Sequence, residues 1–344
     1  MCEMKKCFFL GIWLLGLMLS SLIAEAAADP ALVAVERAQK VRAWHFVLRA
    51  VPLNRAYWMV DQAHTARFNT VVVTVTDGVN LQNAPWKTLS TAWSREDFEK
   101  WVTYTRNKGM DVIPEIKLLT HQEKLFQNNA PLLMFNRSTY DPRNEAVYAQ
   151  VALLIDEIIK ITHAHALHIG HDEVAGHKPR SAKKWLNEGE KMLPAFLFLQ
   201  DVLKLHGYLK QSGIETWMWG DMLISPEEFP DMNPKPLHGG VADYGKALRD
   251  KLPKDIVICD WHYKDDQANF PSLATFRQEG FRALGATWEK PETISNFSHY
   301  AAAHGADGMI ATTWSHVQRK EWDVVERIIR KSGETFGKDF PNGK

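Results

Sequence analysis

The sequence lacks an excess of charge of either sign. Its 344 residues carry 41 basic and 41 acidic side chains, which gives a formal net charge of zero at pH 7. A surface that binds nucleic acid neutralises phosphates with lysine and arginine, so it requires a basic excess. We therefore predict that nucleic acid is not a partner of this protein.

Cysteine is also scarce, with three residues in the whole chain. Cys2 and Cys7 lie within a predicted secretory signal, and Cys7 precedes the apolar run, where a lipid-attachment cysteine would not lie. Cys259 would then be the only cysteine of the mature chain, which excludes an internal disulfide. It lies in the apolar segment "IVICDW" and is most simply a buried small hydrophobic residue.

The N-terminus holds an apolar run of limited length. Lys5 and Lys6 precede apolar residues 8–19, and small residues follow. This is the layout of a secretory signal peptide, which we predict over residues 1–28, with export to the periplasm or the extracellular space. The run is short for a membrane span of about 20 residues, so no stable membrane insertion is expected after cleavage. An uncleaved anchor is the alternative.

No glycine-rich phosphate loop follows the first predicted strand, which removes the usual nucleotide-binding form of an open α/β sheet. Eight short segments, β-branched and apolar on both faces, instead alternate with longer amphipathic ones, as in a parallel sheet covered by helices. Eight such units predict a single (β/α)8 barrel, an α/β fold, over residues 29–344, with a doubly wound open sheet as the alternative. The predicted strands are 44–48, 69–78, 110–119, 166–174, 214–223, 255–263, 281–288 and 308–316.

The helical segments between the strands show start and stop signals. Ser94 is a predicted N-cap, and Gly109 ends the same helix. Apolar residues at three- and four-residue spacing predict helices over 144–163 and 191–212.

Polar and indole side chains gather where the predicted strands end. In a barrel these carboxyl ends converge on one face, where active sites form. Tryptophan, with 13 residues in the chain, fills cores and also stacks against the apolar face of sugar rings. We therefore expect the site on this face. The strand-end residues are Asp77, His121, Asp172, Glu173, Asp221, Asp260, Glu289 and His316, with Trp219, Trp261, Trp288 and Trp314.

The segment "HALHIGHDEV", residues 165–174, places Asp172 and Glu173 side by side. Neighbouring strand residues point to opposite faces, so both reach one site only where the strand breaks into its loop. Adjacent carboxylates are poorly placed to flank a sugar ring at the about 5–5.5 Å of an ordinary retaining glycosidase. We expect Glu173 to be the general acid and Asp172 to hold another group in position.

Several segments resemble glycoside hydrolase family 20, the β-N-acetylhexosaminidases. Residues 141–174, which end in "HIGHDEV", resemble the approach to the family's H-x-G-G-D-E motif. "VIPEIKLLTHQ" resembles its P-E-I-D-x-P-G-H strand, with His121 at the matching spacing. "VTVTDG", "WMWGDML" and "TTWSH" are similar to its second-, fifth- and eighth-strand motifs. The resemblance covers roughly residues 40–330.

The resemblance implies a barrel and substrate-assisted retaining catalysis on terminal β-linked N-acetylhexosamine. Asp172 would orient the 2-acetamido group that attacks the anomeric carbon, and Glu173 would be the acid/base. No cofactor and no metal are expected, and the expected partner is an amino-sugar-containing oligosaccharide or glycoconjugate. The predicted substrate-binding residues are Arg49, Asp77, His121, His171, Trp219, Asp221, Trp261, Trp288, Glu289, Trp314 and His316.

Several positions depart from the family pattern. His171 replaces the second glycine of the motif, and Lys117 stands where the family has aspartate. His316 replaces the glutamate after W-S, and the seventh-strand segment "GATWEK" shows no tyrosine–aspartate element. Arg49 lies one residue off the family's first-strand arginine. The acid/base pair is therefore predicted to be retained in a remodelled sugar pocket.

Two other functions remain open. His171 and His316 could mark a carbohydrate-binding barrel that does not cleave, although retention of Asp172 and Glu173 argues against it. The histidine-rich segment 163–172 suggests a metal-dependent barrel hydrolase. Against this, the H-x-H on a first strand, usual in metal-dependent amidohydrolase barrels, is missing.

Overall fold

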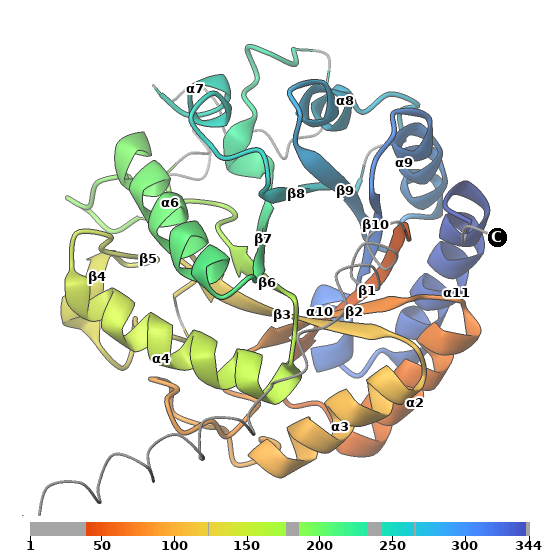
Figure 1. The fold of residues 1–344 in the computed structure, drawn as a ribbon, viewed down its shortest axis with the longest axis horizontal. Helices are drawn as coiled ribbons and strands as arrows, with labels where there is room; N and C mark the ends of the chain where they lie inside the picture. Colours follow the sequence, from red (N-terminus) through yellow and green to blue (C-terminus); the bar gives the residue numbers. More distant parts are fainter. Residues whose placement is uncertain are drawn as a thin grey trace, which may run out of the picture. The chain divides into compact units, whose positions relative to one another are not determined.

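The predicted barrel is present and closed. Eight parallel strands form it in the order β1-β10-β9-β8-β7-β6-β3-β2 (Figure 1), so the single (β/α)8 barrel is confirmed. The predicted signal peptide, residues 1–28, lies outside the described residues. The computed structural model describes residues 39–122, 124–176, 186–230, 232, 243–264 and 266–341.

The barrel strands are short and buried. Every residue of β2, TVVVTV, and of β6, ALHIG, is buried, because one face of each strand points into the barrel and the other against helices. The strands are β1 (Val41–Leu48), β2 (Thr70–Val75), β3 (Asp111–Leu118), β6 (Ala166–Gly170), β7 (Glu215–Trp219), β8 (Val257–Trp261), β9 (Arg282–Thr287) and β10 (Gly308–Thr312).

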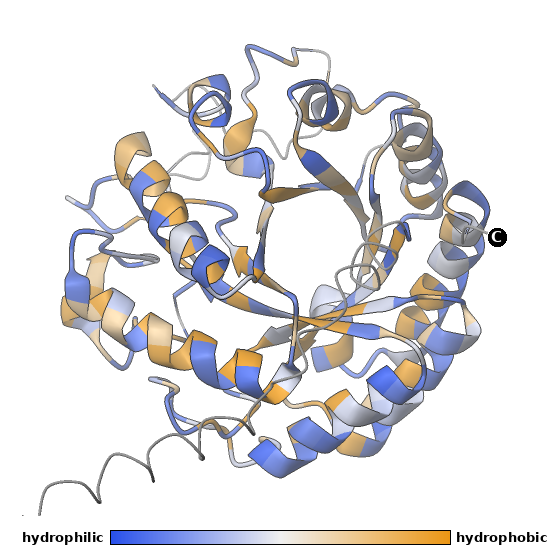
Figure 2. Ribbon diagram, viewed as in Figure 1, coloured by the Kyte–Doolittle hydropathy of each residue, from blue (hydrophilic) through white to orange (hydrophobic). Residues whose placement is uncertain are grey.

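Helices surround the barrel (Figure 1), and most residues of the helix at 95–107 are hydrophilic (Figure 2). The helices are α2 (Leu53–Thr65), α3 (Arg95–Asn107), α4 (Glu145–Thr162), α6 (Ala195–Gln211), α7 (Lys246–Arg249), α8 (Pro271–Gln278), α9 (Pro291–Ala303), α10 (Trp314–Gln318) and α11 (Trp322–Asp339). Short additions are η1 (Pro131–Leu133), the hairpin of β4 (Met134–Asn136) and β5 (Thr139–Tyr140), and η2 (Asp221–Leu223). No helix in the described part of the chain is long and apolar enough to cross a membrane.

The predicted boundaries of α3 are confirmed. Its N-cap is Ser94, whose side-chain oxygen accepts a hydrogen bond from the backbone N–H of Asp97 at 3.0 Å. This satisfies one of the N–H groups that the first helical turn leaves without a partner. Gly109 follows the helix with φ 74°, a left-handed conformation that glycine adopts without strain.

Some predicted strands run too long. The segment 308–316 leaves the sheet at Thr312, and its last residues begin α10, so Trp314 and His316 lie on a helix. Likewise 214–223 ends as a strand at Trp219 and continues as η2. The apolar residues continue past the ends of both strands because the segments that follow are also buried, so hydrophobicity alone does not mark where the sheet ends.

The barrel interior holds a cluster that includes Trp217, Trp219, Cys259, Leu284 and Ile310. Cys259 is buried and free, as predicted. Burial raises the pKa of its thiol well above the usual value, so it stays a neutral, unreactive group.

Candidate active site

The break at the end of β6 brings the two carboxylates to one place. Gly170, His171 and Glu173 have φ angles of 76°, 69° and 51°. For a residue other than glycine this left-handed conformation costs about 1–2 kcal/mol, so it persists only where surrounding contacts hold it. The turn ends the strand alternation just before Asp172. Both side chains of the pair therefore face the same end of the barrel.

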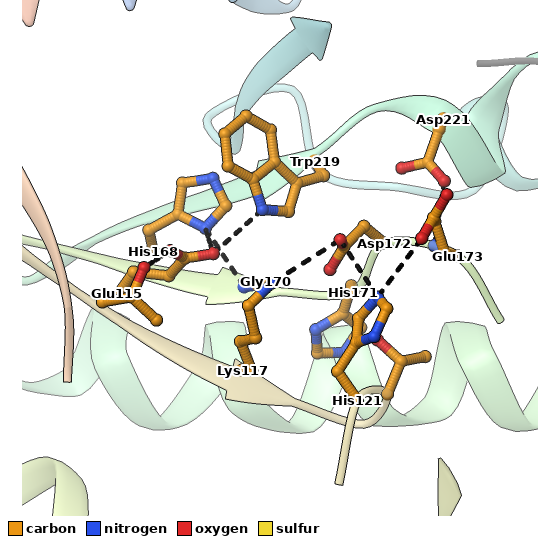
Figure 3. Close-up of polar contacts among 12 residues, drawn as sticks. Glu115, Lys117, His121, His168, Gly170, His171, Asp172, Glu173, Trp219 and Asp221 are labelled. Carbon is orange, nitrogen blue, oxygen red and sulfur yellow. Dashed lines mark hydrogen bonds and ion pairs between the residues drawn. The ribbon is translucent and has the colours of Figure 1, made fainter. Parts of the chain in front are cut away.

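Asp172 and Glu173 share a histidine neighbour (Figure 3). His121 Nε2 lies 3.2 Å from Asp172 Oδ2 and 3.7 Å from Glu173 Oε2. Asp221 contributes from η2, where its Oδ2 accepts a hydrogen bond from the backbone N–H of Glu173 at 2.9 Å. Four of the predicted site residues thus lie together, supplied by the ends of β3, β6 and β7.

Lys117 adds a cation to this group. Its Nζ lies 3.7 Å from Asp172 Oδ2 and 4.8 Å from the ring centroid of Trp314. Burial alone would raise the pKa of Asp172, but the charges of Lys117 and His121 hold it well below its usual range. For His121, burial would lower the pKa, and the Asp172 carboxylate raises it overall. Asp172 is therefore ionised throughout the ordinary pH range.

Beneath this group, Glu115 lies in the barrel interior with no exposed surface. It accepts hydrogen bonds from His45 Nε2 and Trp219 Nε1, both at 2.9 Å, and from Thr74 Oγ1. Trp219 is itself fully buried. Its indole packs inside the barrel beside Glu115, and its contact with a sugar stays a prediction.

His171 does not turn toward the catalytic pair. Its ring is fully buried, with Nε2 2.8 Å from Asp201 Oδ2 on α6 and Nδ1 3.0 Å from the carbonyl oxygen of Ile169. The predicted contact of His171 with substrate does not fit this position. The left-handed turn at residues 170 and 171 is the cause, because it directs the ring outward onto α6.

The remaining predicted residues lie at the ends of their strands. Arg49 Nε donates to Asp77 Oδ1 at 2.9 Å at the ends of β1 and β2. His316 Nε2 lies 3.0 Å from Glu289 Oε2, and its ring centroid lies 5.4 Å from that of Trp288.

Trp261 stacks on Tyr263 with ring centroids 4.8 Å apart. Tyr263 is a residue that the sequence prediction missed, although it follows β8 closely and so meets the same strand-end criterion. Burial raises the pKa of its phenol well above the usual value, and the charges of Asp172 and Glu115 act in the same direction. The phenol therefore stays protonated and can donate a hydrogen bond.

His121, Asp172 and Glu173 also form a group of possible metal ligands, since one ligand atom from each lies within 4.8 Å of the others. One histidine and two carboxylates are ligand types that suit a divalent cation. The Lys117 ammonium group, 3.7 Å from Asp172 Oδ2, opposes a second cation there. The arrangement fits acid/base chemistry better, because Lys117 already supplies positive charge.

Comparison with known proteins identifies the family of the chain. The family profile "Glycosyl hydrolase family 20, catalytic domain" matches residues 42–284. The chain therefore belongs to glycosyl hydrolase family 20, which confirms the predicted family and the prediction of a glycosyl hydrolase. A search of curated proteins finds no match.

Solved structures share the fold. A chitobiase from Flavobacterium johnsoniae superposes with a TM-score of 0.61 at 15% identity, over 87% of this chain and 50% of that one. A β-N-acetylhexosaminidase from Bacteroides fragilis gives 0.61 at 16% identity, over 87% and 66%. Dispersin B gives 0.58 at 15% identity, over 87% and 99%. The chain thus spans half to about two thirds of the length of the first two structures.

Proposed function

We propose that this protein hydrolyses terminal β-linked N-acetylhexosamine residues of oligosaccharides or glycoconjugates by substrate-assisted retaining catalysis. The observation that carries the proposal is the state of Asp172. In the described part of the chain, its Oδ1 is buried and has no hydrogen-bond partner, while Oδ2 faces His121 and Lys117. A buried ionised oxygen without a partner is costly, and the amide N–H of a bound 2-acetamido group would satisfy it.

The remaining groups fit the steps that follow. With the acetamido N–H donating to Asp172, the acetamido oxygen forms a bond to the anomeric carbon as the glycosidic bond breaks, and Glu173 transfers its proton to the departing oxygen. Glu173 then takes a proton from the water that opens the bicyclic intermediate. Its side chain keeps about a quarter of its surface exposed, at 27%, which gives that water access. No second carboxylate has to act as a nucleophile.

The test compares aryl β-N-acetylglucosaminides and β-N-acetylgalactosaminides with the matching aryl β-glucosides. Substrate assistance predicts that removal of the 2-acetamido group lowers kcat/KM by several orders of magnitude, because the nucleophile is lost. A thiazoline mimic of the bicyclic intermediate should inhibit competitively. Equal rates on both substrate types would refute the mechanism and point to Asp221 or Glu289 as an enzymic nucleophile. Binding of the sugar without turnover would favour a carbohydrate-binding barrel.

We also propose that the protein is exported, to the periplasm or the extracellular space. The support is the pattern of residues 1–28, with Lys5 and Lys6 before an apolar run and small residues after it. N-terminal sequencing of the mature protein should find a start near residue 29. An intact N-terminus in the membrane fraction would indicate an uncleaved anchor instead.

A further inference from the structure

We propose that Asp201 and His171 are positioning residues that hold the catalytic loop, residues 170–173, in its working conformation. Both side chains act through the loop backbone. The expected effect on turnover rests on the proposed hydrolase function. The network itself is a property of the fold and can be tested separately.

Asp201 joins three parts of the molecule to α6. It is fully buried, and it accepts hydrogen bonds from Tyr140 Oη at 2.8 Å, from Tyr148 Oη at 2.7 Å and from His171 Nε2 at 2.8 Å. These donors come from β5, from α4 and from the catalytic loop. Burial, with the charge of Asp201, raises the pKa of both phenols, so they remain donors. A buried carboxylate with three fixed donors is a rigid anchor.

The ring of His171 has an acceptor at each nitrogen. Nδ1 lies 3.0 Å from the carbonyl oxygen of Ile169, which can only accept, and Nε2 faces the Asp201 carboxylate. Each ring nitrogen thus has a fixed oxygen partner, one on the backbone of β6 and one on α6. Phe198 packs edge-on against the ring, with centroids 5.5 Å apart at 81°. The two polar contacts and the packing of Phe198 together fix the orientation of the His171 ring.

Asp201 and His171 hold the backbone at a point where successive residues have a left-handed conformation. His171 has φ 69°, directly after Gly170 at 76°, and Glu173 has φ 51°. A non-glycine residue leaves the left-handed region unless contacts hold it there. If the loop relaxed, Asp172 would lose its 3.2 Å approach to His121, and the backbone N–H of Glu173 would lose its 2.9 Å bond to Asp221. Catalytic geometry tolerates little displacement, since about 1 Å can cost 100-fold in rate.

The test compares His171→Leu with His171→Gln. Both variants keep a side chain in the left-handed conformation, so their backbone strain is matched, and only glutamine carries a donor that can reach Asp201. We expect kcat to fall about 10- to 100-fold in His171→Leu, with KM within about twofold, and to recover largely in His171→Gln. Wild-type kcat in His171→Leu, or equal losses in the two variants, would overturn the proposal.

Asp201→Asn tests the same anchor from α6 and should lower kcat without changing KM. Its matched control is Asp156→Asn. Tyr208 Oη donates to Asp156 at 2.6 Å, so this pair also joins α4 to α6 through a tyrosine and an aspartate, but at the outer surface. A loss of kcat in both variants would mean that helix packing alone matters, and would refute a positioning role.

A readout that does not depend on turnover separates the two proposals. Nitrogen-15 NMR of the imidazole groups should show a hydrogen-bonded His171 Nε2 in the wild-type protein, and this signature should disappear in Asp201→Asn and persist in Asp156→Asn. His171 signals that are the same in Asp201→Asn as in the wild type would overturn the network. If the signature is present and the wild type hydrolyses no N-acetylhexosaminide, only the proposed function fails. The backbone amide NMR signals of residues 170–173, shifted in His171→Leu and restored in His171→Gln, then report the loop position without any ligand.

Discussion

Two buried carboxylates near one lysine behave differently in this barrel. Glu115 lies inside the barrel and Asp172 lies at its mouth. Burial raises the pKa of each carboxyl group, and the charge of Lys117 is the largest of the influences that lower it. Glu115 accepts from a histidine, a threonine and a tryptophan and has no exposed surface. In the described residues, Asp172 keeps a buried oxygen without a hydrogen-bond partner.

The difference separates a structural carboxylate from a binding one. The hydrogen bonds of Glu115 are satisfied by the protein, so it stabilises the folded state and has little capacity left for a ligand. Asp172 has a satisfied oxygen that fixes its orientation and a second that a ligand can use. Burial and charge alone would not distinguish Glu115 from Asp172. The two residues differ in whether each carboxylate oxygen has a hydrogen-bond partner in the protein.

The largest effect is expected from the catalytic pair. Asp172→Asn and Glu173→Gln should each lower kcat/KM by about 10²- to 10⁴-fold on substrates with poor leaving groups. On activated aryl glycosides, Glu173→Gln should lower kcat/KM much less, because the leaving group needs little protonation. Asp172→Asn should lower kcat/KM on these substrates as much as on substrates with poor leaving groups. Steady-state kinetics on a leaving-group series measures this. A near wild-type rate in Asp172→Asn would show that its open oxygen does not bind the acetamide.

The next effect concerns Glu115 and falls on stability. Glu115→Gln removes the charge that His45 and Lys117 face, and it leaves buried donors without an ionised acceptor. We expect the free energy of unfolding to fall by about 3 kcal/mol, measured by urea denaturation. The folded fraction should keep its kcat within a few-fold. Exposed Glu145, which pairs with Lys204, is the control, and Glu145→Gln should leave stability unchanged. If Glu115→Gln lowered kcat as much as Asp172→Asn does, Glu115 would not be a purely structural carboxylate.

Lys117→Met should shift the pH dependence of the site. Lys117 holds the pKa of Asp172 below its usual range, so its removal raises that pKa. Asp172 would then become protonated at a higher pH, and the acidic limb of kcat/KM would move upward. Both depressed carboxylates stabilise the fold above their unfolded-state pKa, and this stability is lost as pH falls through the folded-state values. The variant should therefore be less stable near neutrality. Lys204→Met, a control at the surface, should change neither the pH dependence of kcat/KM nor the stability of the fold.

The fold and the position of Asp172 and Glu173 at the end of a strand could be predicted because their signals are local. Eight buried strands with intervening helices show in hydrophobicity, and Asp172 and Glu173 lie where β6 has to end. The family resemblance carried the same information. The end of β10 was missed because Trp314 and His316, which begin α10, are as apolar or aromatic as the strand before them.

The orientation of individual side chains could not be predicted. His171 would face the catalytic pair if the strand continued, and it faces α6 because two successive left-handed residues rotate it away. Its partner Asp201 lies 30 residues further along the chain. The indole of Trp219 is buried by its bond to Glu115, which comes from another strand. Such contacts depend on backbone angles and distant partners that residue type does not reveal.

The smallest expected effect comes from His316, where the related family has glutamate. His316 lies between two carboxylates, with Nε2 3.0 Å from Glu289 Oε2 and Nδ1 hydrogen-bonded to Glu321. His316→Glu would therefore place three carboxylates together, and the like charges would repel. We expect a stability loss on the order of 1 kcal/mol and no gain in kcat/KM, although the change restores the family residue. His316→Gln, which adds no charge, should be nearly neutral for stability. A gain in kcat/KM in His316→Glu, measured at several salt concentrations, would instead show that this side of the barrel mouth still accepts the family's sugar-contacting glutamate.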